Sequence, residues 1–379
     1  MHMMQTGPGP RTTVDGKEYL YFCGTGYLGL QNDPRLLEAA CEATRQFGLG
    51  TATSRSGYGT SSPVAEVERL AANYWGCESA FYFASGYMGN HVVLSALAES
   101  VDAVFLDAYA HYSIVDACRS FDLPVETFNH RDPQSLSEAL SASLLPRQRP
   151  LVMSDGVFAS SGALAPANDY LAVLAAYEGA ALCLDDCHAF GVLGASGRGS
   201  FEHHGVDLDR INQTPDHDPA TGVRLFAVGT LSKAFGAYGG IVCGSRVFID
   251  LARRSSHYYS GASAPPTPVA AAAAAALQLI AENPERIARV QQNARRLKQG
   301  LKSLGLTTDD APTPIAGLEI GNEQNMRRIQ QAMAADGVLI AYSPEYSGIG
   351  PEGALRISVF ATHSGEDLLQ LLDCLSRRL

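Results

Sequence analysis

Four short apolar segments constrain the fold of this chain more than any other feature. They are AVFLDA at 103–108, RPLVMSD at 149–155, AALCLDD at 180–186 and RLFAVGT at 224–230. Other segments have helical spacing, such as SPVAEVERLAANYWG and NDYLAVLAAYEG. Continuous apolar strands that alternate with helices are typical of a parallel sheet covered on both faces. We therefore predict an α/β fold built on a large, mostly parallel sheet.

The pattern changes after about residue 265. A long helix is predicted from PVAAAAAAALQLIAENPERIARVQQNARRLKQGLKSLG, with a break near Pro284. It is followed by IAGLEIG, the helix NEQNMRRIQQAMAADG and the strands VLIAYS and ALRISVF. We predict three parts, namely an N-terminal segment at 1–45, a large domain at 46–264 and a smaller α+β domain at 265–379.

Composition narrows the classes of partner. The formal net charge is −11, and no stripe of basic residues with interleaved aromatic residues is present, so nucleic acid and anionic membranes are not expected partners. The longest apolar run, at 268–281, is too short to span a bilayer. The eight cysteines form no CxxC pair, and MHMMQTGPGP lacks the apolar core of a signal peptide. We expect a cytoplasmic protein with free thiols.

Two strand ends carry the residues best suited to chemistry. The segment ALCLDDCHAFGVLGASGRGS contains Asp185 at the end of a strand and His188 just after it. The segment RLFAVGTLSKAFGAYGG contains Thr230 at a strand end, followed by Ser232 and Lys233. In open α/β sheets, ligands bind at the carboxyl ends of the strands. Both motifs are therefore expected to face one crevice.

These residue types match what pyridoxal phosphate requires from a protein. The cofactor needs a lysine for its aldehyde, a carboxylate against its ring nitrogen and groups that bind its phosphate. Lys233, Asp185 and the hydroxyls of Thr230 and Ser232 supply these groups. Each motif alone is also consistent with a surface lysine and a helix-capping aspartate, so the prediction depends on the pair.

Two further segments complete the predicted site. In FYFASGYMGN, Ser85, Gly86 and Tyr87 stand at a helix start, where backbone N–H groups bind phosphate. In LDAYAHYSIVDA, His111 follows a strand and is placed to stack on a flat ring. Taken alone, His111 is better explained as a core histidine.

Together and in this order, these segments resemble the α-oxoamine synthase family of fold-type I pyridoxal-phosphate enzymes. That family includes 8-amino-7-oxononanoate synthase, 2-amino-3-ketobutyrate CoA ligase, 5-aminolevulinate synthase and serine palmitoyltransferase. The likeness runs from about Tyr19 to the C-terminus and covers YLGL, SGYMGN, LDDCHAFGVLGASGRGS, GTLSKAFGAYGG and LRISVFATHSGEDL. It implies a large sheet domain sandwiched by helices, a smaller C-terminal domain and a homodimer with the active site at its interface.

The resemblance also implies roles for single residues. Lys233 resembles the Schiff-base lysine and general base, Asp185 the partner of the ring nitrogen, His188 the partner of the phenolic oxygen and His111 the ring-stacking histidine. The implied phosphate-binding residues are Ser85, Gly86, Tyr87, Thr230, Ser232 and, from the loop SHYYSGASAPP toward the partner subunit, Ser260. The implied substrate-binding residues are Arg356, which resembles the arginine that grips a carboxylate, Thr25 and Ser54.

The segment GTGYLG at 24–29 is also a GxGxxG. A Rossmann-type binding module built on it predicts affinity for NAD and no lysine-bound chromophore. The following helix is expected to begin at Asp33 and Pro34, too late to place its N-terminus on a pyrophosphate. The resemblance instead places these glycines beside the substrate channel.

The chain departs from the family pattern where substrates are held. Thr25 replaces an asparagine or tyrosine, Val64 a common histidine, Ala159 a serine and Gly261 a threonine, and 203–222 is an atypical polar insertion. Within that insertion, His203-His204 and Asp216-His217-Asp218 lack the spacing of metal ligands, so no metal ion is expected.

The resemblance implies the decarboxylative condensation of alanine, glycine or serine with an acyl-CoA or acyl-carrier-protein thioester, which gives an α-aminoketone. Alanine with a medium acyl-CoA is the favoured pair, and His111 or His188 is expected to polarise the acyl carbonyl. The departures leave an alternative open, an aminotransferase or retro-aldol lyase acting on a small amino acid. The mark of that alternative would be a requirement for an α-keto acid and none for a thioester.

Overall fold

The four apolar segments form the middle of one sheet, as their continuous hydrophobicity predicts. The structure, a computed structural model, describes residues 2–213 and 222–379. The sheet has the strand order β3-β9-β8-β7-β6-β4-β5. The strands are β3 (Ser79–Phe83), β4 (Ala103–Asp107), β5 (Val125–Phe128), β6 (Pro150–Asp155), β7 (Ala181–Asp185), β8 (Arg224–Thr230) and β9 (Gly240–Gly244). Strands β8, β7, β6, β4 and β5 run parallel, whereas β9 is antiparallel to β8 and β3, so the prediction of a mostly parallel sheet is confirmed.

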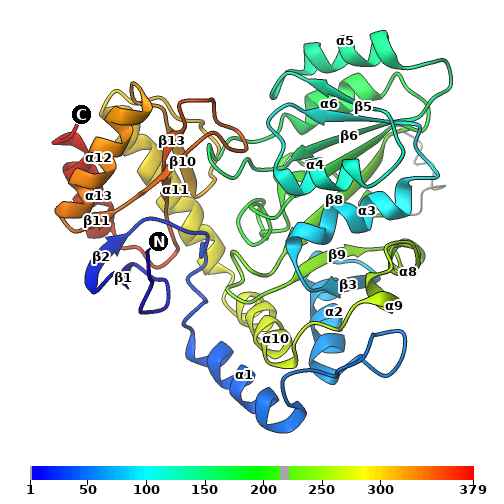
Figure 1. The fold of residues 1–379 in the computed structure, drawn as a ribbon, viewed down its shortest axis with the longest axis horizontal. Coiled ribbons are helices and arrows are strands. Elements are labelled where there is room, and N and C mark those ends of the chain that lie inside the picture. The colour runs from blue at the N-terminus through cyan, green and yellow to red at the C-terminus, as the bar shows by residue number, and fades with distance from the viewer. Residues whose placement is uncertain (1, 214–221) are drawn as a thin grey trace.

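Helices cover both faces of this sheet because successive side chains of a strand point to opposite faces. Val104 and Leu151 belong to a core shared with α3, α4 and α8, and Phe105 and Val152 to a core shared with α2, α5, α6 and α10. These helices are α2 (Ser62–Trp75), α3 (Gly89–Leu97), α4 (Tyr112–Arg119), α5 (Pro133–Ser143), α6 (Ala167–Leu174), α8 (Arg246–Ser255) and α10 (Thr267–Glu282). Figure 1 shows the two helical layers around the sheet.

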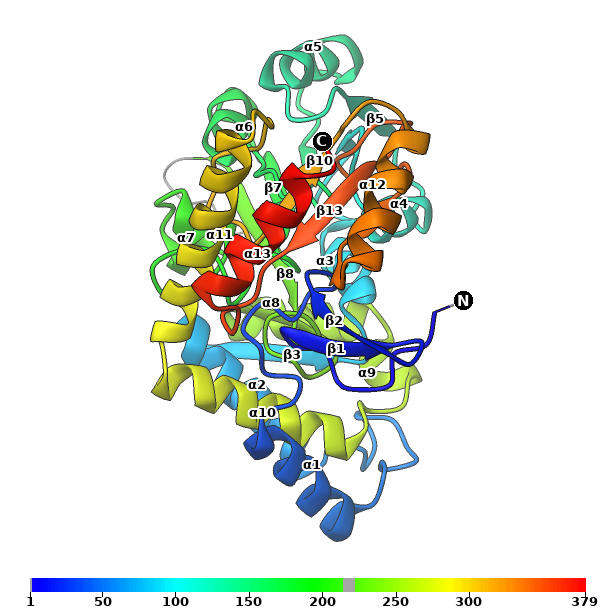
Figure 2. The ribbon, with the colours of Figure 1, turned by 90° about the vertical axis from the view of Figure 1, so that its left-hand side faces the viewer.

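The alanine-rich segment forms α10, which packs against α1 (Pro34–Phe47) and α2. Figure 2 shows these three helices together at the bottom of the molecule. As predicted, the helix breaks near Pro284, and α11 (Glu285–Ser303) continues toward the C-terminal elements. In the part of the chain that the structure describes, no helix is both long and apolar enough to cross a bilayer.

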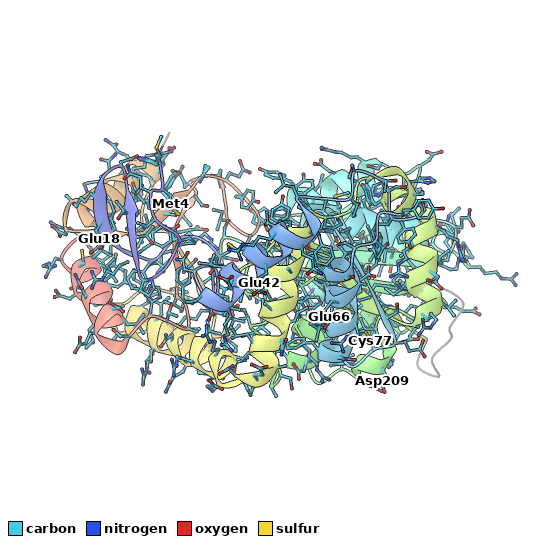
Figure 3. The ribbon with its side chains drawn as sticks, turned by 90° about the horizontal axis from the view of Figure 1, so that it is seen from below. Met4, Glu18, Glu42, Glu66, Cys77 and Asp209 are labelled. Carbon is cyan, nitrogen blue, oxygen red and sulfur yellow. The ribbon has the colours of Figure 1, made fainter. Side chains whose placement is uncertain are left out.

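A third core belongs to the C-terminal elements and includes Leu20 and Phe22 from the start of the chain. It is built from α11, β10 (Ile315–Leu318), α12 (Glu323–Ala335), β11 (Val338–Leu339), β12 (Ala341–Ser343), β13 (Ala354–Ser358) and α13 (Gly365–Ser376). Strands β1 (Arg11–Val14) and β2 (Lys17–Tyr21) join β11 in a small sheet. In Figure 3, Glu18 of β2 accordingly lies beside α13, and Cys77 lies toward the opposite end. Division of the chain at 45/46 and 264/265 stays a proposal.

The prediction of VLIAYS as one strand is wrong. Val338 and Leu339 pair with β2, whereas 341–343 pairs with β13 in a second sheet of order β10-β13-β12. The chain changes sheets at Ile340, which is fully buried in the C-terminal core. Local apolar spacing cannot reveal this change, because it depends on which distant strands offer an edge.

The described residues also form the α-helical turns α7 (Ser200–His203) and α9 (Tyr258–Gly261) and 3₁₀ helices at Gly86–Met88 and Leu208–Arg210. Within the predicted insertion at 203–222, the His204 ring bonds the carbonyl of Ala165 through Nε2 at 3.1 Å. The predicted segment Asp216-His217-Asp218 lies outside the described residues.

A buried histidine in the C-terminal core gives a test of stability against pH. The His363 ring stacks between Phe22 and Phe360, with centroid distances of 4.3 and 5.0 Å. Its Nδ1 accepts the N–H of Phe360, and its Nε2–H donates to the carbonyl of Tyr21. Burial lowers the pKa of His363 from 6.5 to about 4. The folded protein therefore binds fewer protons than the unfolded chain between these pH values, and stability falls as the pH drops from 6.5 toward 4.

We expect His363→Gln, which keeps one acceptor and one donor but does not titrate, to make the free energy of unfolding less sensitive to acid. Between pH 7 and pH 5 the variant should lose about 2 kcal/mol less than the unmodified protein. Urea unfolding at the two pH values measures the difference, and His257→Gln on the surface is the control. Equal acid losses in the unmodified and His363→Gln proteins would contradict the assignment.

Candidate functional site

A cavity of about 220 Å³ lies at the carboxyl ends of the central strands. It is lined by Ser85, Gly86, Tyr87, His111, Ser113, Asp155, Asp185, Cys187, His188, Thr230, Ser232 and Lys233. Strands β6, β7 and β8 end there, because parallel strands bring their carboxyl ends to one edge of the sheet. The cavity thus brings together every residue predicted for the cofactor except Ser260.

Asp185 is the last residue of β7, and its buried carboxylate is held by fixed donors. The side-chain amide of Asn90 donates to Oδ2 at 2.7 Å, and the backbone N–H of Cys187 donates to Oδ1 at 2.9 Å. The hydroxyl of Ser113 lies 3.5 Å from Oδ2. These contacts orient a negative charge at the floor of the cavity. Asn90 was not singled out from the sequence, although it ends the quoted segment SGYMGN.

A second carboxyl group lies beside Asp185. Asp155 ends β6 and is directly paired in register with Asp185 of β7. It accepts the backbone N–H of His111 at 2.8 Å. Burial first, and then the neighbouring charge of Asp185, raise the pKa of Asp155 well above its usual range. Asp155 was not predicted as a site residue from the sequence, although its place at a strand end was a signal for the site.

His188 is tied to the second half of the chain through a tyrosine. Tyr27 Oη lies 2.7 Å from Nδ1 of His188 and 3.5 Å from Nη2 of Arg356. Burial raises the pKa of Tyr27 to about 12, so its hydroxyl keeps its proton and can donate a hydrogen bond to Nδ1 of His188. In the tautomer that accepts this bond, the proton of the neutral imidazole is on Nε2. Burial, followed by the charges of Lys233 and Arg356, lowers the pKa of His188 well below its usual value, which keeps the ring neutral.

His111 caps α4 at the mouth of the cavity. Its Nδ1 accepts the backbone N–H of Ser113 at 3.1 Å and lies 2.8 Å from the Ser113 hydroxyl. Its Nε2 lies 2.5 Å from the hydroxyl of Tyr346, which comes from the loop between β12 and β13. Burial lowers the pKa of His111, so this imidazole is also neutral. Sequence reasoning missed Tyr346.

Residues at and just after the end of β8 line another part of the cavity. The hydroxyls of Thr230 and Ser232 lie 2.8 Å apart, and Lys233 is the next residue. Gly86 approaches this strand end so closely that a Cβ there would lie 2.7 Å from Cβ of Thr230. Only glycine allows such an approach, which places the turn at 85–87 and the Thr230 hydroxyl side by side.

The residues of the cavity fit pyridoxal phosphate. A primary amine, an oriented carboxylate, a neutral imidazole with a free Nε2–H and a group of hydroxyls surround one space. These are the groups that the aldehyde, the ring nitrogen, the phenolic oxygen and the phosphate of this cofactor require. The close approach at Gly86 supplies the cradle where a phosphate would be held.

Arg356 lies next to the cavity without lining it. Its Nε donates to the carbonyl of Ala159 at 2.8 Å, and its Nη1 donates to the hydroxyl of Ser358 at 2.7 Å and to the carbonyl of Gly24 at 3.1 Å. Within residues 2–213 and 222–379, the only hydrogen bond of Nη2 is to the hydroxyl of Tyr27, at 3.5 Å. Nη2 is therefore the part of Arg356 left for a carboxylate ligand. Thr25 adjoins this contact through the carbonyl of Gly24.

Ser54 and Ser260 do not line the cavity of this single chain. They belong to two loops that lie against each other, since Ser54 bridges Ser263 and the N–H of Ser56 donates to the carbonyl of Tyr259 at 3.1 Å. Ser260 is exposed on α9. The predicted role of Ser54 in substrate binding and that of Ser260 toward the phosphate of the partner subunit remain predictions.

The departures from the family pattern fall in different surroundings. Val64 is fully buried in α2, the carbonyl of Ala159 accepts a hydrogen bond from Arg356, and Gly261 is exposed at the end of α9.

The helix after GTGYLG begins at Pro34 with Asp33 as its N-cap, as predicted. No group of three metal-ligating side chains occurs within the described ranges.

The whole chain is similar to known proteins. Residues 17–375 match the family described as aminotransferase class I and II. The chain is 34% identical to an 8-amino-7-oxononanoate synthase 1 from Bacillus velezensis, and the match covers 98% of this chain and 91% of that protein. It is 33% identical to an 8-amino-7-oxononanoate synthase from Symbiobacterium thermophilum, and that match covers 97% of this chain and 90% of that protein. A serine palmitoyltransferase structure from S. paucimobilis, solved with PLP and myriocin, superimposes with a TM-score of 0.88 at 26% identity, covering 100% of this chain and 92% of that one.

Proposed function

We propose that this protein catalyses the decarboxylative condensation of a small amino acid with an acyl thioester in its cavity. The chain belongs to the aminotransferase class I and II family and, within it, to the α-oxoamine synthases. The observation that carries this proposal is the cavity itself, where Lys233, Asp185 and His188 surround one space. The enzyme is a pyridoxal-phosphate-dependent acyltransferase.

We propose that the cofactor is held by the residues that the cavity brings together. Asp185 would face the ring nitrogen, the Nε2–H of His188 the phenolic oxygen, and His111 the flat face of the ring. The turn at 85–87 and the hydroxyls of Thr230 and Ser232 would bind the phosphate. Bound there, pyridoxal phosphate supplies an aldehyde for a primary amine and a ring that takes up electrons from the α-carbon of an amino acid.

Lys233 is the proposed base for the α-proton of the amino acid. Lys233 lines the same cavity as Thr230, Ser232 and Asp185. The α-carbon then bonds to the thioester carbonyl, and the C–S bond breaks to release the thiol with a proton. The α-carboxylate leaves as CO₂, and a proton from solvent takes its place, which balances the reaction.

Arg356 is the proposed partner of the substrate carboxylate. Its Nε and Nη1 are fixed by Ala159, Ser358 and Gly24, so its orientation is set before substrate binds. Through Nη2, beside the hydroxyl of Tyr27, it offers a charged donor, and a charged donor to a carboxylate gives a strong hydrogen bond. Thr25, on the neighbouring turn, and Ser54 remain proposed contributors to substrate binding.

We propose alanine with a medium acyl-CoA as the first pair to test, because the curated relatives named above are 8-amino-7-oxononanoate synthases. Glycine, serine and an acyl-carrier-protein thioester are the other proposed substrates. We also propose a cytoplasmic homodimer, in which the loops of Ser54 and Ser260 would reach the partner subunit.

Release of free thiol tests the function. The purified protein is combined with a panel of acyl-CoAs and with glycine, alanine and serine, and the thiol is followed with a colorimetric reagent. We expect release that requires one amino acid and one class of acyl-CoA. If no pair releases thiol while the protein consumes amino acid only with an α-keto acid, the function is that of an aminotransferase. Amino acid cleavage without either co-substrate would instead identify a lyase.

A further inference from the structure

Both ring nitrogens of His111 are engaged by the protein. The backbone N–H of Ser113 can only donate, so Nδ1 is the acceptor of that bond and carries no proton in the neutral ring. Burial lowers the pKa of His111, and the ring is therefore neutral at physiological pH. The remaining proton is on Nε2.

The proton on Nε2 is directed to Tyr346. Nε2 and the phenol oxygen are 2.5 Å apart, and the two rings meet edge to face at 88° with centroids 5.5 Å apart. Because Nε2 is the donor, the phenol oxygen is the acceptor. The hydroxyl proton of Tyr346 is then left for another acceptor, and His111 has no free N–H to offer.

The loop that carries Tyr346 is seated firmly on the large domain. A tight turn joins the N–H of Ile349 to the carbonyl of Tyr346 at 2.9 Å. The hydroxyl of Ser347 lies 3.5 Å from Oδ2 of Asp155. Gly348 has φ +83°, and a Cβ there would lie 2.7 Å from Cβ of Phe158. These contacts hold the loop of Tyr346 against the end of β6 and the segment that follows it.

Through its hydroxyl, Tyr346 contacts His111, which lines the cavity. Burial and the carboxyl groups of Asp155 and Asp185 raise the pKa of Tyr346, and the guanidinium of Arg356 opposes them. The phenol therefore keeps its proton and lies within electrostatic reach of Arg356, the proposed partner of the substrate carboxylate. A neutral hydroxyl donor beside His111 suits an oxygen that gains negative charge during reaction.

We propose that Tyr346 is a catalytic residue that donates its hydroxyl hydrogen bond to the carbonyl oxygen of the acyl thioester. His111 acts as the positioning residue, since its Nε2–H fixes the phenol oxygen. As the α-carbon attacks, the electrons of the C=O bond move to that oxygen, and the hydrogen bond strengthens without transfer of the proton. When the C–S bond breaks, the carbonyl is restored and the thiol leaves. This inference rests on the function proposed above and deepens it.

The test compares Tyr346→Phe with Tyr112→Phe. Phenylalanine keeps the ring and its packing against His111 and removes only the hydroxyl. Tyr112 is a matched control, because its ring centroid lies 5.2 Å from that of Tyr346 and its side chain is half exposed. Tyr346→Phe should lower the kcat of thiol release about 10- to 100-fold, somewhat less than the loss of a principal oxyanion donor. Tyr112→Phe should stay within about twofold of the unmodified protein.

Two measurements separate this role from a structural one. Exchange of the α-proton of the amino acid with deuterated solvent, without thioester, depends on Lys233 and should be unchanged in Tyr346→Phe. Histidine ¹⁵N NMR of the full-length protein as purified should show His111 protonated at Nε2, with a proton signal that moves upfield in Tyr346→Phe. Thiol release at the unmodified rate, or equal loss of exchange and thiol release, would overturn the assignment of Tyr346.

Failure of the proposed function gives a different result. If the unmodified protein exchanges the α-proton but releases no thiol with any thioester, the acyl transfer and this role of Tyr346 both fall. If it releases thiol and Tyr346→Phe does so equally well, only the role of Tyr346 falls.

Discussion

Lys233→Ala should abolish thiol release, with a loss of at least about 10³-fold, because it removes the only amine that lines the cavity among the described residues. The same amine is the proposed attachment point of the cofactor and the base for the α-proton. The variant should fold normally, since Lys233 is followed by the buried pair Ala234 and Phe235, which the substitution leaves in place. Thiol release and α-proton exchange are the assays, and both should be lost together.

Lys302→Ala is the matched control for this variant. Lys302 lies on α11 and forms an ion pair with Asp310 outside the cavity. Its removal changes the net charge by the same amount and should leave the rate unchanged. Reduction of the unmodified protein with borohydride, followed by peptide mass spectrometry, should find the pyridoxyl group on Lys233. A pyridoxyl group on another lysine, or thiol release by Lys233→Ala above one-tenth of the unmodified rate, would contradict the assignment.

Asp185→Asn should lower thiol release roughly 10²-fold or more, although asparagine has nearly the shape of aspartate. The carboxylate is buried and held by Asn90 and Cys187, and the change removes its negative charge and leaves the amide of Asn90 without a charged acceptor. An opposite charge within a few ångströms shifts a pKa by about 1–3 units, so a ring nitrogen that faces an uncharged amide at this position would hold its proton less well. Electron uptake from the α-carbon would weaken accordingly, and α-proton exchange should fall with thiol release.

Asp186→Asn makes the same change one residue further along. Asp186 is also buried, but its carboxyl accepts the N–H and hydroxyl of Ser200 at 2.8 and 2.5 Å rather than lining the cavity. Burial raises the pKa of Asp186 to about 7, so this group carries a full charge only above neutral pH. We expect Asp186→Asn to change stability more than the rate per folded molecule. Equal losses of rate in the two variants would show that Asp185 has no special role.

The sequence was sufficient for the parts of the site that follow from strand order. Asp185 and Lys233 stand at or just after the ends of apolar strands, and parallel strands bring their carboxyl ends together, so their meeting is a local and general consequence of the sheet. His111 and the turn at 85–87 also follow strand ends. The short apolar runs were enough to predict the sheet and its parallel character.

What the sequence could not reveal depends on contacts between distant segments. Tyr346 reaches His111 from a loop that has no strand-end position of its own, and Tyr27 reaches His188 from a segment 161 residues earlier in the chain. The change of sheet at Ile340 depends on β2, at the other end of the chain. Asp155 was within reach of the strand-end rule and was overlooked because its motif contains no neighbouring lysine or histidine.

The balance between released CO₂ and released thiol tests the central claim most directly. The protein is given a carboxyl-¹³C-labelled amino acid and the acyl-CoA that supports thiol release, and labelled CO₂ and free thiol are measured in the same reaction. Decarboxylative condensation predicts one labelled CO₂ for each thiol, with neither product formed by Lys233→Ala. Thiol without labelled CO₂, or labelled CO₂ without thiol, would contradict the condensation at this site.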